Sequence, residues 1–217
     1  MVTPLVLAGI DWLAVARRQK HLEYVFKPAT LVAVLIGAWL LTQGPHDAWE
    51  ARFFLPGLAF SLAGDVFLML PGGRFFLPGL AAFLLAHLCY IAGLNPTPPP
   101  WPALVLLVVA AAIGLALFRS VAASLRRQGQ TGLLVPVAIY SLVLSLTLFS
   151  AWATLFRPEW TPLRRGLVIV GASLFFGSDA MLAWDRFVTP SPSARLRVIV
   201  TYHLGQVALA ASIALAG

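Results

Sequence analysis

Residues 101–118 read WPALVLLVVAAAIGLALF, a stretch of eighteen residues without a single charged side chain. A run of this length and apolarity can cross the hydrocarbon core of a membrane as one helix. The whole chain has the same character, because 60% of its 217 residues are hydrophobic and only 11% are charged, against about 25% charged in a soluble domain. This composition excludes a soluble domain and a disordered chain, and it predicts an all-α, polytopic membrane protein.

Proline, glycine and charged residues divide the sequence into eight apolar runs, which predict a single integral membrane domain over residues 1–217. The loops between the runs are short, so neighbouring helices should be antiparallel. The linker Asn95–Pro102 is rich in proline, cannot be helical and divides the helices into two sets of four. The predicted helices lie at about 3–16, 28–42, 53–70, 75–93, 101–118, 132–156, 166–184 and 197–216.

The basic residues are unevenly distributed over the predicted loops. If the N-terminus lies outside, eleven of the fifteen Lys and Arg residues fall on the inner side. Inner loops of membrane proteins are enriched in these residues, so we expect both termini outside, in a bacterial inner membrane. Short basic clusters between apolar runs also account for the net charge of +7 without a nucleic-acid partner. The single cysteine, Cys89, excludes an internal disulfide.

Five ionisable side chains fall inside the predicted helices: Asp11, Asp65, His87, Asp179 and His203. Each costs a few kcal/mol at that depth, so it normally faces a cavity or a partner. From the rise of the helix, Asp65, Asp179 and His203 should lie about 10 Å beneath the inner surface, with His87 nearer the outer side. Asp is a poor packing residue in lipid, so Asp65 and Asp179 are the main functional candidates. Asp11, expected to reach an interface, and His203 are interpreted as structural.

Two further patterns surround these residues. The segment Arg52–Ala59 recurs unchanged as Arg74–Ala81, and at the same offset of 22 residues Asp65 corresponds to His87. The repeat indicates either one membrane-anchoring sequence used twice or two polar groups directed into a shared site. Gly57 and Ser61 share a helix face with Asp65, which leaves space for a ligand or for close helix packing.

Lys27 and Pro28 are predicted to open the second helix at the inner surface. Proline suits the first helical position, and a helix N-terminus with a lysine attracts anions. A phospholipid headgroup is the anion expected at that height. The alternative is an interfacial lysine that faces bulk lipid.

Short motifs from residue 24 to 210 form an ordered set. In chain order they are Lys27-Pro28, Gly57-Leu58, Ser61, Gly64-Asp65, Phe76, Gly79-Leu80, Phe83, Ala86-His87, Tyr90, Gly177-Ser178-Asp179, Tyr202 and Gln206. No single motif is specific, but the set at these spacings resembles the YhhN family of eight-helix bacterial proteins and animal lysoplasmalogenases. The first predicted helix carries no matching motif.

The resemblance implies hydrolysis of the vinyl ether of a lysoplasmalogen, a membrane lysophospholipid, to a fatty aldehyde and a glycerophospho-alcohol, without cofactor or metal. Such hydrolysis adds a proton to the alkene carbon that is not bonded to oxygen, and water then captures the oxocarbenium ion. It therefore requires one protonated carboxyl and one carboxylate, a division of labour that glycosidases also use. Burial and a second nearby carboxyl both favour the protonated form of a carboxyl group. We expect Asp65 and Asp179 to form this acid/base pair, with either one as the acid.

The other candidates are expected to bind the substrate while its alkenyl chain lies among the apolar helices. Lys27 would hold the phosphate. The residues expected to orient water or to contact the glycerol part are Ser61, His87, Tyr90, Ser178, Tyr202 and Gln206.

Two other functional classes fit the same residues. Two Asp and two His could bind Zn²⁺ for amide or ester hydrolysis, although the usual closely spaced His motifs are missing from the sequence. A proton-coupled carrier of lipid or small molecules would use Asp65 and Asp179 as relay sites, but the sequence lacks a convincing inverted repeat. A purely structural role leaves both aspartates unexplained. The sequence specifies no oligomeric state.

Overall fold

A computed structural model describes residues 1–43 and 49–215, which form eight α-helices and no strand. This confirms the predicted all-α membrane bundle. Short 3₁₀ turns precede α4, α5 and α6, and another follows α6. The helices are α1 (Val2–Ala16), α2 (Lys20–Leu41), α3 (Trp49–Met69), α4 (Phe76–Leu94), α5 (Leu104–Arg127), α6 (Leu134–Ala153), α7 (Pro162–Phe187) and α8 (Ala194–Ile213).

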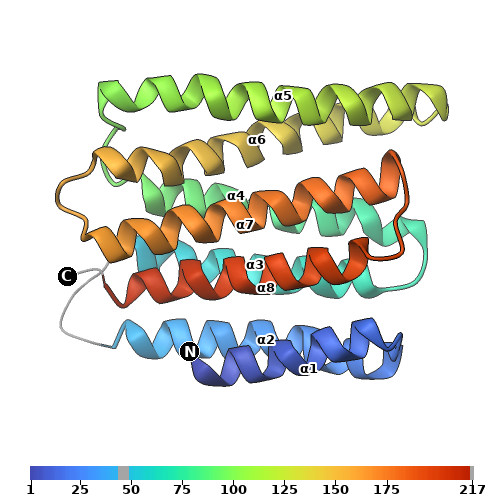
Figure 1. The fold of residues 1–217 in the computed structure, drawn as a ribbon, viewed down its shortest axis with the longest axis horizontal. Coiled ribbons are helices and arrows are strands. Elements are labelled where there is room, and N and C mark those ends of the chain that lie inside the picture. Colours follow the sequence, from blue (N-terminus) through green and yellow to red (C-terminus); the bar gives the residue numbers. More distant parts are fainter. Residues whose placement is uncertain (44–48, 216–217) are drawn as a thin grey trace.

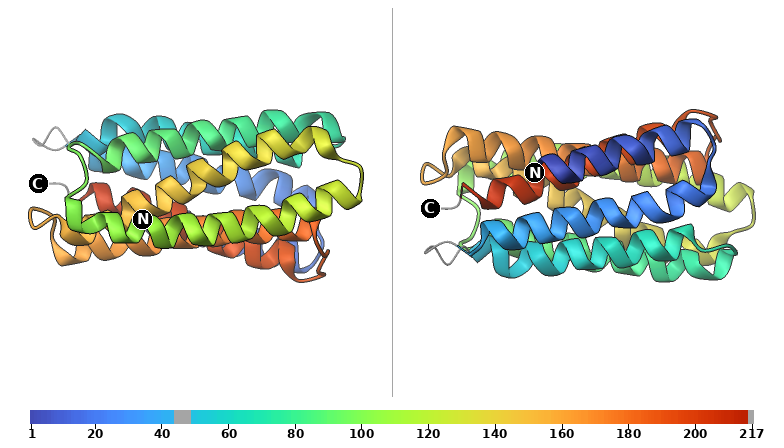
Figure 2. Two further views of the ribbon diagram at one scale, coloured as in Figure 1. Left: turned by 90° about the horizontal axis from the view of Figure 1, so that it is seen from above. Right: turned by 90° about the horizontal axis from the view of Figure 1, so that it is seen from below.

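The helices lie roughly parallel to one axis, and successive helices run in opposite directions (Figure 1). The most extensive packing joins α3 to α4 and α7 to α8. Contacts of α2 with α8 and of α4 with α6 connect the first four helices to the last four. The two further views show α5 at the periphery, beside α6 and α7 (Figure 2). The centre of the bundle is therefore enclosed by α2, α3, α4, α6, α7 and α8.

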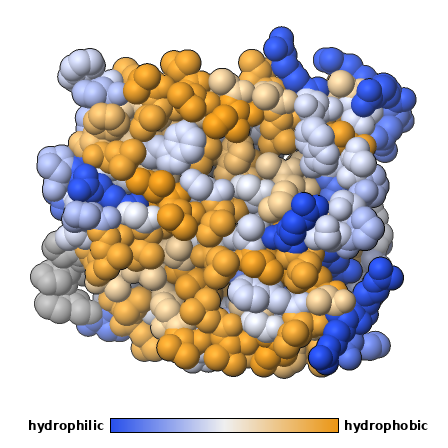
Figure 3. Space-filling model, viewed as in Figure 1, coloured by the Kyte–Doolittle hydropathy of each residue, from blue (hydrophilic) through white to orange (hydrophobic). Residues whose placement is uncertain are grey.

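The outer surface is apolar in the middle and polar at the ends. Within the described residues, seven helices are long and apolar enough to cross a membrane, whereas α1 has only 15 residues. Apolar side chains cover the middle of the face shown in Figure 3, and hydrophilic ones gather most densely at one end. An apolar surface of this extent is unfavourable in water but suits the hydrocarbon core of a bilayer, so it is the lipid-facing surface of an integral membrane protein.

The more hydrophilic end carries most of the positive charge and is called the basic end below. It holds the α1–α2 turn and the α7–α8 loop (Figure 1). The membrane side that this end faces stays a prediction. Its basic residues include Arg17, Arg18, Lys20, Arg74, Arg126, Arg127, Arg186, Arg195 and Arg197.

The predicted start of the second helix is wrong. The structure begins α2 at Lys20 and places Pro28 inside it. Proline removes one helical hydrogen bond and crowds a carbonyl one turn earlier, but membrane helices tolerate it where side chains satisfy the freed groups. The hydroxyl of Thr30 donates to the carbonyl of Phe26 at 2.7 Å in this turn. Lys27 therefore lies two turns inside the helix and not at its N-terminus.

The fifth helix also differs from its prediction, because α5 continues to Arg127 and not only to residue 118. The residues beyond 118 are polar enough to leave the apolar run, yet Ala, Leu and Arg among them are strong helix formers. Hydropathy marks where a chain leaves the hydrocarbon and does not mark where its helix ends.

Candidate active site

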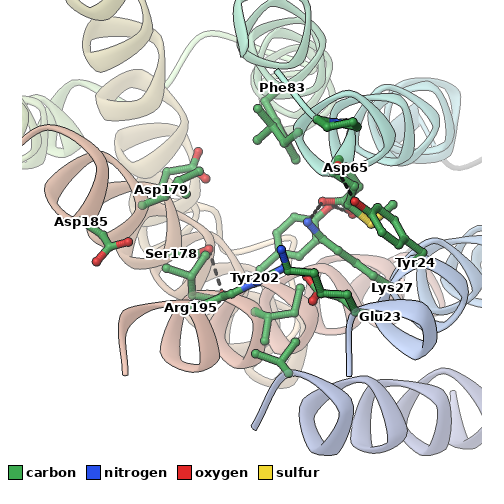
Figure 4. Close-up of a pocket in the computed structure, with 18 residues that line it drawn as sticks. Glu23, Tyr24, Lys27, Asp65, Phe83, Ser178, Asp179, Asp185, Arg195 and Tyr202 are labelled. Carbon is green, nitrogen blue, oxygen red and sulfur yellow. Dashed lines mark hydrogen bonds and ion pairs between the residues drawn. The ribbon is translucent and has the colours of Figure 1, made fainter. Parts of the chain in front are cut away.

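A cavity of about 420 Å³ lies among α2, α3, α7 and α8 toward the basic end. Its volume is within the range of small-molecule sites. Figure 4 shows Asp65 and Asp179 on opposite sides of it. Of the residues that the sequence singled out as site residues, five line this cavity: Lys27, Asp65, Ser178, Asp179 and Tyr202.

Asp65 on α3 forms an ion pair with Lys27 on α2. Nζ of Lys27 lies 2.8 Å from Oδ1, and the hydroxyl of Tyr202 donates to Oδ2 at 2.8 Å. The Asp65 side chain is only 1% exposed, so two partners compensate its removal from water. Gly64 lets the ring of Phe83 approach the α3 backbone, because a Cβ there would lie 2.6 Å from that ring. The close packing of α3 on α4 thus fixes the position of the carboxylate.

Asp179 on α7 has a different set of partners. Nε2 of His87 lies 3.0 Å from its Oδ2, and the hydroxyl of Tyr140 donates to the same oxygen at 2.5 Å. Oδ1 of Asp179 has no hydrogen-bond partner in the described part of the chain. One oxygen of this carboxyl is therefore anchored, and the other is available to a ligand in the cavity.

The two carboxyls share a cavity but not a partner. No described residue hydrogen-bonds to both Asp65 and Asp179, so each belongs to its own polar cluster. One cluster contains a lysine and a tyrosine, and the other contains a histidine and a tyrosine. The two carboxyls consequently have different electrostatic surroundings, which the sequence did not distinguish.

The position expected for His87 is corrected by its contact with Asp179. Depth counting placed His87 nearer the outer side, yet its ring touches the carboxyl directly. Counting residues locates only the backbone along the helix axis, and the two side chains cover the remaining separation. His87 is fully buried and does not line the cavity, so it supports Asp179 from behind.

Tyr140 is a site residue that the sequence analysis missed. It lies on α6, and its hydroxyl reaches Asp179 across the bundle. A tyrosine in the middle of an apolar run was the available signal, since a buried hydroxyl requires a polar partner.

Ser61, Tyr90 and Gln206 form a second polar network behind the cavity wall. The hydroxyl of Tyr90 donates to Oε1 of Gln206 at 2.7 Å, and Nε2 of Gln206 donates to Oγ of Ser61 at 3.0 Å. All three are buried, and none lines the cavity. A Cβ on Gly57 would lie 2.9 Å from the ring of Tyr90. Around Gly57 and Ser61, this face of α3 therefore serves close helix packing and does not leave space for a ligand.

Ser178 lines the cavity, while its hydroxyl donates to the carbonyl of Val198 at 3.1 Å. This bond ties α7 to α8 next to Asp179.

The remaining intramembrane residues lie outside the cavity. Nδ1 of His203 accepts from the indole of Trp12 at 3.2 Å, a contact that joins α1 to α8. Asp11 does not reach an interface as expected but is fully buried in α1. Its carboxyl oxygens have no hydrogen-bond partner among the described residues. A zinc site would need three or four protein ligands at one point, and in residues 1–43 and 49–215 no three His, Cys, Asp or Glu side chains converge in that way.

A narrow apolar crevice of about 50 Å³ adjoins the cavity on the α4–α6 side. It shares Leu68, Phe83, Asp179 and Leu182 with the main cavity. Its other walls include the apolar residues Phe76, Leu80, Val121, Val137, Leu144 and Phe187, together with Tyr140, Ser141 and Arg186. Asp179 therefore lies at the boundary between a cavity with several charged residues in its wall and a mainly apolar crevice.

Together, the fold and this cavity define an integral membrane helical bundle with two separately paired carboxyls near one end. The chain belongs to the YhhN family, which it matches over residues 22–213. The match confirms the resemblance inferred from the motifs, and it includes Lys27, Asp65, Ser178, Asp179 and Tyr202. No solved structure matches the chain.

Several characterised and uncharacterised relatives cover most of the chain. Lysoplasmalogenase TMEM86B of Mus musculus is 32% identical over 185 residues, which are 85% of this chain and 72% of the relative. The lysoplasmalogenase of Mycobacterium bovis is 31% identical over 170 residues, 75% of this chain and 60% of the relative. The uncharacterized membrane protein YhhN of Escherichia coli O6:H1 is 31% identical over 163 residues, 72% of this chain and 70% of the relative.

Proposed function

We propose that this protein is a lysoplasmalogenase-like hydrolase that cleaves the vinyl ether of a membrane lysophospholipid. The names of its relatives support an ether-bond hydrolase. The observation that carries the proposal is the position of Asp179, which lines both the main cavity and the mainly apolar crevice. A lysoplasmalogen has a polar glycerophospho half and an apolar chain, and the vinyl ether lies at their junction. A lysoplasmalogen bound across the two spaces would therefore place its vinyl ether next to Asp179.

In this proposal Asp179 is the general acid. Its Oδ2 is anchored by His87 and Tyr140, which leaves Oδ1 to carry the proton toward the substrate. The proton passes from Oδ1 to the alkene carbon that is not bonded to oxygen, and the electron pair of the double bond forms the new C–H bond. The ether oxygen then shares its lone pair with the adjacent carbon, which gives an oxocarbenium ion beside the Asp179 carboxylate. His87, hydrogen-bonded to Oδ2, is placed to return a proton to this carboxyl.

Asp65 is the carboxylate in this scheme. Its ion pair with Lys27 and its bond from Tyr202 favour the anion, which stabilises a nearby cation and can accept a proton from water. Water adds to the oxocarbenium carbon and loses a proton to Asp65, and a hemiacetal results. Asp65 passes this proton to the glycerol oxygen while the hemiacetal hydroxyl releases its own proton to water, and the C–O bond breaks to give a fatty aldehyde and a glycerophospho-alcohol. The net reaction consumes one water.

The other predicted residues divide by position. Ser178 and Tyr202 lie on the cavity wall and would contact the glycerol part. His87 acts through Asp179, whereas Ser61, Tyr90 and Gln206 would keep α3, α4 and α8 in place. Lys27, expected to hold the phosphate, already neutralises Asp65, so we assign it to that carboxylate.

The direct test measures aldehyde released by the purified protein from a 1-alkenyl lysophospholipid. The saturated 1-alkyl and the 1-acyl lysophospholipids are the substrate controls, because neither contains a vinyl ether. Asp179→Asn should lose at least about a hundredfold in kcat, the usual contribution of a general acid. Asp11→Asn is the matched control, since Asp11 is equally buried in a membrane helix but does not line the cavity. Normal aldehyde release by folded Asp179→Asn would refute the assignment.

A further inference from the structure

A second cavity, of about 410 Å³, opens at the basic end between the α1–α2 turn and the α7–α8 loop. We call it the basic vestibule. Three of its lining residues are cationic: Arg18, Lys20 and Arg195. The rest of its wall consists of Val15, Ala16, Pro192, Ser193 and Leu196, which contain no carboxylate.

The basic vestibule and the active-site cavity share part of their walls. Val15, Lys20 and Arg195 line both. A ligand whose ends differ in chemistry could therefore occupy both cavities at once, with one end at the two aspartates and the other at the cations.

The cations of the vestibule are not equally compensated. Arg195 pairs with Glu23, and its side chain is still 58% exposed. Neither Arg18 nor Lys20 forms an ion pair within the described ranges, and both are exposed. By contrast, Asp65 already neutralises the deeper Lys27. Of the cations that line the active-site cavity itself, the uncompensated one thus belongs to the vestibule, because Lys27 is neutralised.

Backbone groups add to this charge. Lys20 is the first residue of α2, and Ser193 is the residue that precedes α8, so two helix N-termini border the same cavity. No side chain caps either terminus. Free N–H groups and the positive end of the helix dipole favour an anion at such a place. Charged side chains and helix termini therefore indicate the same kind of ligand.

We propose that the basic vestibule binds the phosphate of the lysophospholipid substrate, with Arg18, Lys20 and Arg195 as its contacts. This inference rests on the proposed function and names the site of the headgroup. The glycerol backbone joins the phosphate to the vinyl ether, so a phosphate site must adjoin the catalytic cavity, as the shared wall allows. A free phosphate ion or the headgroup of another anionic lipid has the same chemistry and is distinguished below.

Glu23 competes with the phosphate in this arrangement. It holds Arg195 in the unliganded protein and would lose this partner to the incoming anion. Glu23→Gln should therefore bind the phosphorylated ligand more tightly than the unaltered protein, whereas Arg18→Gln and Lys20→Gln should bind it more weakly.

The test uses binding, so that it does not depend on catalysis. The probes are 1-O-alkyl lysophosphatidylethanolamine, which has the phosphate but no vinyl ether, and 1-O-alkylglycerol, which lacks the phosphate. Calorimetry with the full chain in neutral detergent should give Arg18→Gln and Lys20→Gln a roughly three- to tenfold higher Kd for the first probe. The Kd for the second probe should not change. Lys20→Arg keeps the positive charge and should retain the Kd for the first probe. The control Arg127→Gln, at the end of α5, should have the same Kd as the unaltered protein.

The proposal would be overturned if Arg18→Gln and Lys20→Gln lost affinity equally for both probes, or if they lost affinity for neither. Inorganic phosphate that competes with the first probe but not with the second would support a phosphate-specific site. A further experiment measures the Kd for the first probe in vesicles of phosphatidylcholine with and without phosphatidylglycerol. If the Kd of the variants differs from that of the unaltered protein only when phosphatidylglycerol is present, the vestibule binds bulk anionic lipid and the assignment to substrate is overturned. Failure of the hydrolase proposal would appear separately, as probe binding without aldehyde release from the alkenyl lipid.

Discussion

Nε2 of His87 lies 3.0 Å from Oδ2 of Asp179, and this contact joins α4 to α7 at the edge of the active-site cavity. His87 itself does not reach the cavity, so it can influence chemistry there only through the carboxyl. In the proposed mechanism His87 would return a proton to Asp179, and its contact holds Oδ2 away from the ligand.

His87→Gln should lower kcat by about a hundredfold and leave KM within about twofold. The amide can still hydrogen-bond to Oδ2 but cannot return a proton at neutral pH. Steady-state aldehyde release from an alkenyl lysophospholipid provides both constants. A rise in KM with an unchanged kcat would show that His87 only shapes the substrate site.

Lys27→Met should destabilise the protein by about 3–5 kcal/mol, because it leaves the buried Asp65 without its cation. Thermal unfolding in detergent, followed by circular dichroism, measures the change. In the double variant Lys27→Met with Asp65→Asn no charge remains unpaired, so most of the lost stability should return while activity does not. If the double variant were as unstable as the single one, the ion pair would not be the source of the effect.

Tyr90→Phe should cost about 1–3 kcal/mol of stability, since Oε1 of Gln206 loses its donor in a buried position. Activity per folded molecule should stay within about threefold, because neither residue lines the cavity. The two quantities are obtained from denaturation in detergent and from rates corrected for the folded fraction. A selective loss of kcat without loss of stability would instead place Tyr90 in the catalytic machinery.

Gly171→Ala should destabilise the bundle by about 1–3 kcal/mol through overpacking. A Cβ at this position would lie 3.0 Å from the carbonyl oxygen of Gly205, where the backbones of α7 and α8 approach each other. Gly166→Ala is the control in the same helix, because nothing lies within 4 Å of its Cβ position. This control should be as stable as the unaltered protein or slightly more stable, and unfolding midpoints in one detergent compare the two variants.

The number and type of the helices could be predicted from the sequence because hydrophobic length is a local property. The two aspartates could also be singled out, since a carboxyl at hydrocarbon depth is costly wherever the helices pack. The partners of these carboxyls could not be derived in the same way. Whether Lys27 faces bulk lipid, a phosphate or Asp65 depends on the rotation of α2 and on where that helix begins.

The start of α2 shows why the error arose. Proline is common at helix starts, so Lys27 and Pro28 suggested one, but Pro28 lies inside α2 and brings Lys27 to the depth of Asp65. Tyr140 was missed for a related reason, because one hydroxyl in an apolar helix gains meaning only once the facing residue on α7 is known.

The boundary position of Asp179 has a consequence for how the products would leave. In the proposed reaction, scission at this carboxyl would yield an apolar fragment beside the crevice and a water-soluble fragment beside the main cavity. The aldehyde would diffuse sideways into the bilayer, while the glycerophospho-alcohol would escape past the cations of the vestibule to the aqueous phase. Separate exits of this kind would clear the site for the next turnover and would keep a reactive carbonyl away from the lysine.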